Sequence, residues 1–111
     1  MEQRRTRRFK LQLPLALTRA GSQRLADSGL TKNISSCGVL FTAQRELDVG
    51  GAIEYVITLI DETPHAVNLK CIGKVVRYEK ANGASEDIAR FTVAATVERY
   101  EFVRIVDGLI S

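Results

Sequence analysis

Apolar side chains recur at every second residue in several segments of this chain. From Ile53 to Leu59, and again from Val67 to Val75, apolar residues alternate with residues that are mostly polar or charged. A period of two is typical of β-strands, because successive side chains of a strand point to opposite faces of its sheet. The chain is therefore predicted to fold mainly from strands that each bury one face in a shared core.

Six strands are predicted, and 111 residues are enough for one domain with a modest core. The predicted segments are 9–17, 30–34, 39–41, 53–59, 67–75 and 91–97. Pro14 cannot donate a backbone hydrogen bond and is expected at an edge or a bulge. Residues 23–29 are expected to form a polar connection, and Asn82-Gly83 predicts a hairpin turn.

Short strands joined by turns indicate a barrel or a sandwich. Inward side chains fill a small barrel, so a ligand is expected to bind outside it.

The pattern changes near the end of the chain. Phe102, Ile105, Val106 and Leu109 lie at positions i, i+3, i+4 and i+7, which is typical of one face of a helix. The sequence therefore predicts a C-terminal amphipathic helix from Arg99 to about Ile110.

The charge of the chain is concentrated at its start. The formal net charge is only +3, but five basic residues crowd the N-terminus: Arg4, Arg5, Arg7, Arg8 and Lys10. Such a cluster indicates an anionic partner more specifically than the net charge does. Residues 1–8 are expected to form a flexible arginine-rich arm that binds the ligand, and residues 9–111 the folded domain.

Several classes of protein are poorly supported. The chain opens with charged residues and has no apolar run long enough for a signal peptide or a membrane span, so a cytoplasmic location is expected. In that compartment Cys37 and Cys71 are expected to be reduced thiols, and Cys37 is interpreted as structural. His65 is the only histidine, so no metal site is predicted. The sequence shows no combination of nucleophile, base or metal ligands that would indicate an enzyme.

Two short motifs carry the candidate chemistry. Arg4 and Arg8 present planar guanidinium forks that match phosphate oxygens and the O6/N7 edge of guanine. Asn33 and Ser35 offer an amide and a hydroxyl at a turn, and Gly38 lets backbone approach closely or adopt positive φ. Each motif alone also fits a plainer interpretation, a basic tail or a self-bonded β-turn.

In this order along a six-strand pattern, the two motifs resemble those of the PilZ domain family of bacterial cyclic di-GMP receptors. The family signature is Arg-x-x-x-Arg followed by Asp/Asn-x-Ser-x-x-Gly. Arg4 and Arg8 match the first part, and Asn33, Ser35 and Gly38 match the second. Asn33 stands where Asp is commoner, which leaves the affinity for guanine open.

The resemblance implies an all-β fold, a six-stranded antiparallel barrel of the split-barrel type with a C-terminal helix, and no catalysis or cofactor. It implies that Arg4 and Arg8 bind the phosphates and guanines of cyclic di-GMP with help from Arg5. It also implies that Asn33 and Ser35 contact a guanine while Gly38 permits the approach. We expect the ligand to order the N-terminal arm and create a surface for a downstream protein partner.

Two alternatives remain at this point. The first is a PilZ-like adaptor that acts through protein contacts without nucleotide. The second is a basic nucleic-acid-binding barrel, which is less favoured because the chain has no Trp and most Phe lie in core rows. Arg77 and Arg90 are further candidates for ligand contact. The sequence leaves open the oligomeric state, the ligand stoichiometry and the downstream process.

Overall fold

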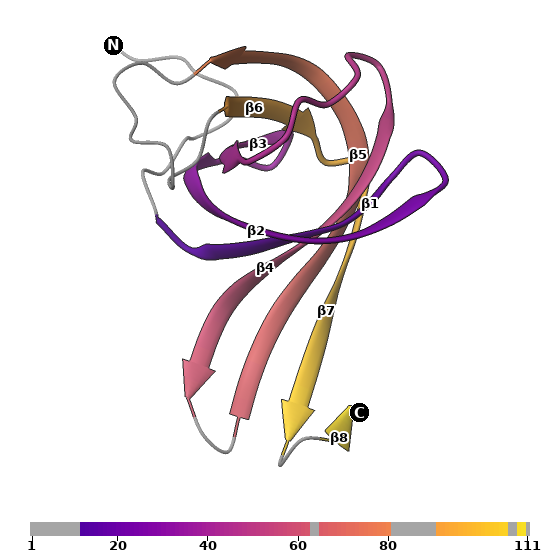
Figure 1. The fold of residues 1–111 in the computed structure, drawn as a ribbon. Coiled ribbons are helices and arrows are strands. Elements are labelled where there is room, and N and C mark those ends of the chain that lie inside the picture. Colours follow the sequence, from indigo (N-terminus) through magenta and orange to yellow (C-terminus); the bar gives the residue numbers. More distant parts are fainter. Residues whose placement is uncertain (1–11, 63–64, 81–90, 107–108, 111) are drawn as a thin grey trace, which may run out of the picture.

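The computed structural model describes residues 12–62, 65–80, 91–106 and 109–110. These residues form eight strands and no helix, so they include no helix that could cross a membrane (Figure 1). The strands are β1 (Pro14–Ala20), β2 (Gln23–Ile34), β3 (Gly38–Ala43), β4 (Ala52–Glu62), β5 (His65–Lys80), β6 (Phe91–Thr96), β7 (Arg99–Val106) and β8 (Leu109–Ile110).

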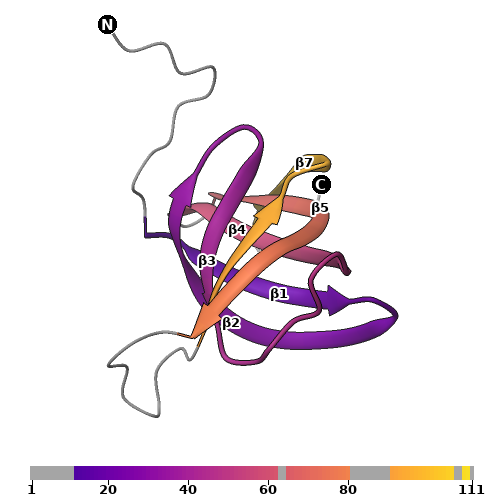
Figure 2. The same cartoon turned by 90° about the horizontal axis from the view of Figure 1, so that it is seen from above.

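Six of these strands close into a barrel in which every neighbouring pair is antiparallel. The order around the barrel is β1, β2, β3, β6, β5 and β4, and β4 pairs again with β1. Figure 2 shows the molecule from above, with β1 and β2 side by side. Closure removes the free edges that an open sheet of this size would present. The prediction of an all-β fold built on a six-stranded antiparallel barrel is therefore confirmed.

A second, smaller sheet projects from one end of the barrel. The C-terminal half of β5 pairs with β6, whereas its N-terminal half, His65–Ile72, pairs with β7. β4 accompanies β5 along the projecting part, and the short β8 pairs with the end of β7 (Figure 1). One long strand, β5, thus belongs to both the barrel and the projecting sheet.

The core fills the inside of the barrel with alternate residues of its strands. Its largest fully buried side chains include Phe41, Tyr55 and Leu17, and the rings of Phe41 and Tyr55 lie 5.6 Å apart. The hydroxyl of the buried Tyr55 has a hydrogen-bond partner, because it donates to the backbone oxygen of Thr96 at 2.9 Å. The period of two in the sequence therefore identified the inward faces correctly.

A close backbone approach marks the point where β6 ends and β7 begins beside β5. A Cβ atom added to Gly73 would lie 1.8 Å from the backbone oxygen of Thr96. The next contact along β5 is the Glu98 N–H, which donates to the Ile72 oxygen at 2.9 Å. Only glycine at position 73 lets the chain cross so near to β5 and start a new strand on its edge.

The predicted C-terminal helix is wrong over Arg99–Val106, which form strand β7. The N-terminal half of β5 has no partner on this side once β6 has left it, and an unpaired row of backbone groups is unfavourable. The residues of β7 pair with β5 one by one from Ile72↔Arg99 to His65↔Val106. The hydrogen bonds gained by pairing with β5 outweigh the weak helical spacing of these residues, and the segment is also rich in residues that favour strands.

Smaller predictions near the N-terminus also need correction. The polar connection predicted at 23–29 is the first half of the long strand β2. Pro14 lies neither on an edge nor at the bulge of β1, which falls between Leu17 and Arg19, but is the first residue of the strand. The predicted strand start at Phe9 and the predicted hairpin at Asn82-Gly83 lie outside the described residues.

Candidate functional site

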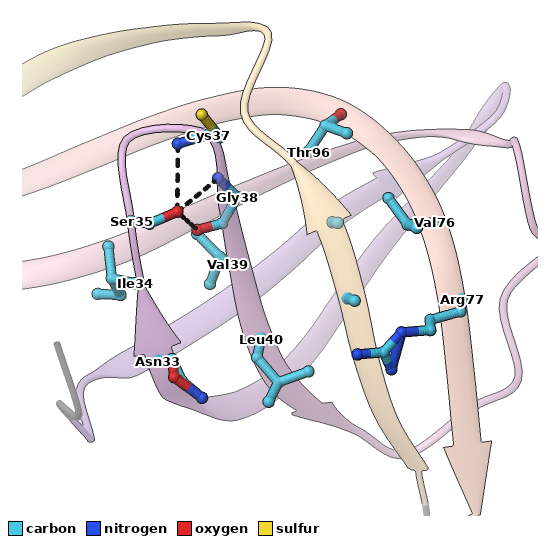
Figure 3. A pocket seen from close by; sticks show the side chains of 12 residues that line it. Asn33, Ile34, Ser35, Cys37, Gly38, Val39, Leu40, Val76, Arg77 and Thr96 are labelled. Carbon is cyan, nitrogen blue, oxygen red and sulfur yellow. Dashed lines mark hydrogen bonds between the residues drawn. The ribbon is translucent and has the colours of Figure 1, made fainter. Parts of the chain in front are cut away.

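A hollow of about 340 Å³ lies on the outer surface of the barrel, over strands β2, β3, β6 and β5. The segment from Asn33 to Gly38, where β2 turns into β3, lines one side, and Val76 and Arg77 of β5 line the other (Figure 3). Small side chains of β6, such as Ala94, line the surface between them. The hollow therefore offers a largely apolar floor with polar groups at its two sides.

Register places four lining residues in one row across the sheet. Asn33 is opposite Leu40, Leu40 is opposite Ala94, and Ala94 is opposite Arg77. Residues directly opposite each other share a face of the sheet, so Asn33 and Arg77 both belong to the outer face. Three strand spacings separate their backbones, which is about 14 Å along the sheet. A ligand with two polar ends can be held from both sides.

Ser35 is engaged within its own turn. Its Oγ accepts hydrogen bonds from the backbone N–H groups of Cys37 at 3.2 Å and Gly38 at 3.1 Å, and its hydroxyl donates to the Gly38 oxygen at 3.2 Å (Figure 3). The Ser35 N–H also donates to the same oxygen at 2.9 Å. Ser35 therefore fixes the shape of the turn, as the plainer interpretation of this residue predicted.

Gly38 is required by the neighbouring strand rather than by an unusual backbone angle. Its φ lies outside the left-handed region, whereas a Cβ atom at this position would lie 2.8 Å from the backbone oxygen of Ala95. Close packing of β3 against β6 thus explains the glycine. The same missing side chain keeps the floor of the hollow open beside the turn.

Asn33 and Arg77 are the two polar side chains best placed to meet a ligand. The Asn33 amide makes no hydrogen bond to any residue that the structure describes, so its donors and acceptor are available. The Arg77 guanidinium lies 3.6 Å from the Glu79 carboxylate, and both side chains are mostly exposed. An exposed ion pair of this kind is weak and is readily exchanged for a phosphate.

The sequence matches the family model of the PilZ domain over residues 2–106, nearly the whole chain. The chain belongs to the PilZ domain family. PilZ domains are receptor domains for cyclic di-GMP, and they bind ligands and partners rather than catalyse reactions. Searches of curated proteins and of solved structures found no significant match.

The structure brings together part of the PilZ signature that the sequence predicted. Asn33, Ser35 and Gly38 line the same hollow. Arg4, Arg5 and Arg8 lie outside the described residues, as does Arg90. The grouping of the second motif is therefore observed, while the contribution of the arginine motif stays a prediction.

Arg77 lies at the same hollow because of the strand order, which the sequence does not display. It was only one of two weaker candidates, because its strand is distant from the turn in sequence. The strand order β2-β3-β6-β5 brings it onto the same row as Asn33. A bulge between Val75 and Arg77 adds Val76 to the rim, where it is 51% exposed. The adjacent valines Val75 and Val76, which interrupt the apolar alternation just before Arg77, were the one signal available in the sequence.

The two thiols have different surroundings. Cys37 is an exposed free thiol that lines the hollow, and Cys71 is a buried free thiol in the core. Burial raises the pKa of Cys71 to about 11, although its contact with the Tyr55 hydroxyl acts in the opposite direction. Cys71 is thus protonated and unreactive at neutral pH.

No metal centre is found in the part of the chain that the structure describes. It contains no group of three or more His, Cys, Asp or Glu side chains close enough to hold an ion. The side chains that line the hollow offer an amide, hydroxyl groups and a guanidinium, which can recognise a ligand by hydrogen bonds and charge.

Proposed function

We propose that the hollow between the β2–β3 turn and Arg77 binds cyclic di-GMP, and that the domain acts as a receptor for this nucleotide. The observation that carries the proposal is the row from Asn33 to Arg77, with only Leu40 and Ala94 between them. The row combines a hydrogen-bonding amide, an apolar floor and a cation, which are the complements of a base edge, a base face and a phosphate.

Asn33 recognises guanine in this proposal. A side-chain amide offers one acceptor and two donors, and guanine offers the N1 and N2 donors beside the O6 acceptor, so two hydrogen bonds can form together. The apolar side chain of Leu40 lies beside Asn33 on the same face and supports the base from below. Ser35 contributes by holding the backbone of the turn in place.

The arginines neutralise the two phosphates. Arg77 approaches from β5, and Arg4, Arg5 and Arg8 approach from the N-terminal segment that leads into β1. Each guanidinium can form paired, charge-assisted hydrogen bonds with phosphate oxygens. Closure of the N-terminal segment over the ligand would change the surface around the hollow, and a downstream protein partner would read that change.

Titration calorimetry of the full chain with cyclic di-GMP tests the assignment. We expect wild type to bind and Asn33→Ala, Arg77→Ala and Arg8→Ala each to weaken binding by about tenfold or more, because each removes a paired contact to a base or phosphate. Cyclic di-AMP should bind much less well, since adenine presents a donor where guanine has O6.

Matched substitutions outside the hollow serve as controls. Asn68→Ala on the N-terminal half of β5 and Arg24→Ala on β2 remove the same functional groups away from the site, and both should retain wild-type affinity. If calorimetry detects no binding of cyclic di-GMP to the wild-type chain, the result contradicts the proposal and favours the adaptor that works without nucleotide. Equal losses in Asn68→Ala and Asn33→Ala would contradict the placement of the site.

A further inference from the structure

Among the residues that the structure describes, strand β7 has one edge that is open before Ile105. β5 pairs with one side of β7 along its length, while β8 pairs with the other side only at Ile105 and Val106. In the described ranges no strand covers the outer edge of β7 before Ile105, and Figure 1 shows β7 at the border of the projecting sheet. A free edge of this kind is a template for pairing with another strand.

Two large aromatic side chains stand on this open strand. Tyr100 is 61% exposed and Phe102 is 64% exposed, and their rings meet nearly edge to face with centroids 6.0 Å apart. They lie opposite Cys71 and Leu69 of β5, so they continue the core face of the sheet beyond the barrel. Paired exposed aromatics on an edge strand are typical of a protein interface rather than of free surface.

The face of β7 opposite to Tyr100 and Phe102 carries charged side chains, and these charges indicate what the edge would pair with. Glu54 of β4 and Lys70 of β5 form an ion pair at 3.8 Å, and Lys70 lies opposite Glu101 of β7. Charge sign therefore alternates across three successive strands. Arg99 shares the outer face with Glu101, two residues away on the same strand. An edge that presents Arg99 and Glu101 in this way is complementary to itself when reversed.

We propose that two copies of this domain associate edge to edge through antiparallel pairing of their β7 strands. Tyr100 lies at the two-fold axis opposite Tyr100 of the second copy. Arg99 then faces Glu101 of the second copy, and Glu101 faces Arg99 of the second copy. The alternation of charge continues from Glu54 through Lys70 and Glu101 into the other sheet, and the aromatics of both copies meet on the core face.

Two other registers are less favourable. A shift that centres the pair on Glu101 places two carboxylates directly opposite each other, which is repulsive. A shift that centres it on Phe102 places Arg99 opposite Ile105 of the second copy, whose edge is already paired with β8. The register centred on Tyr100 keeps the paired stretch clear of β8 in both copies.

The association is expected to be weak, because a single pair of short edge strands buries less area than a standard interface of about 1,600 Å². It does not rest on the proposed nucleotide binding. The hollow involves β2, β3, β6 and the C-terminal half of β5, whereas β7 pairs with the N-terminal half.

Sedimentation velocity of the full chain over a range of concentrations, without nucleotide, tests this proposal. The mass should rise from 12.3 kDa toward twice that value as concentration increases. Arg99→Glu should raise the dissociation constant by about tenfold or more, because two attractive pairs become repulsive. The double variant Arg99→Glu/Glu101→Arg should regain association, since the exchanged charges again face each other.

Arg24→Glu on β2 makes the same charge change away from the edge and should associate like wild type. Circular dichroism of each variant separates loss of association from loss of fold, which matters most for Glu101→Arg beside Lys70. The proposal is overturned if wild type stays monomeric at the highest concentration, if folded Arg99→Glu associates as well as wild type, or if the folded double variant fails to recover.

Discussion

At the residue scale, the two polar members of the turn motif have different tasks. Ser35 accepts two backbone N–H bonds and donates one, so its hydroxyl is used inside the turn. Asn33 lines the same hollow with an amide that the described part of the chain leaves unbonded. A loss of ligand affinity on removing Ser35 would therefore report on the turn as much as on contact with the ligand.

Stability measurements should separate these two tasks. Ser35→Ala is expected to lower the free energy of unfolding by about 1–2 kcal/mol, because it leaves the N–H groups of Cys37 and Gly38 without their acceptor. Asn33→Ala should change it by less than about 0.5 kcal/mol. Urea unfolding followed by circular dichroism measures both, and an equal loss in the two variants would contradict the division of roles.

At the element scale, β5 organises the molecule because it pairs with β4 on one side and with β6 and then β7 on the other. The exchange from β6 to β7 happens beside Gly73, where the Thr96 oxygen lies too close for any side chain. The spacing of apolar residues after Arg99 predicted a helix. That prediction failed because local periodicity carries no information on a distant strand that lacks a partner. The strands with clear alternation were predicted correctly for the opposite reason, because their pattern reflects burial in the core.

Substitution of Gly73 tests this account of β5. Gly73→Ala should lower the free energy of unfolding by about 1–3 kcal/mol, because a Cβ atom 1.8 Å from the Thr96 oxygen forces β6 and β7 away from β5. Displacement of Thr96 would also strain the hydrogen bond from the buried Tyr55 hydroxyl. Urea unfolding is the measurement, and a midpoint equal to that of wild type would show that β7 does not depend on this close approach.

At the scale of the whole molecule, a filled barrel leaves only its outer surface for ligands, and the hollow lies on that surface (Figure 3). Groups from distant parts of the chain meet there: Asn33 from the end of β2 and Arg77 from β5. The N-terminal arginines enter the proposed site only if the segment before β1 reaches the same surface when the ligand binds. The proposed signal is this closure.

Limited proteolysis tests the closure directly. Saturating cyclic di-GMP should slow tryptic cleavage after Arg4, Arg5 and Arg8 by about tenfold or more, because bound guanidinium groups are withheld from the protease. Cyclic di-AMP at the same concentration and the Arg77→Ala variant provide the controls. Unchanged cleavage at these sites in a sample shown by calorimetry to be saturated would exclude closure while leaving binding intact.

The sequence by itself determined the class of fold, the inward faces of most strands, the family and the turn motif, because each depends on a local pattern or on residues close together in the chain. Only the tertiary structure decided that the last segment is a strand, that Arg77 shares a row with Asn33, and that the Ser35 hydroxyl is occupied by its own turn. The physical reason is that hydrogen bonds between strands, and the meeting of side chains across a sheet, depend on which distant segments become neighbours. Local periodicity does not encode that choice.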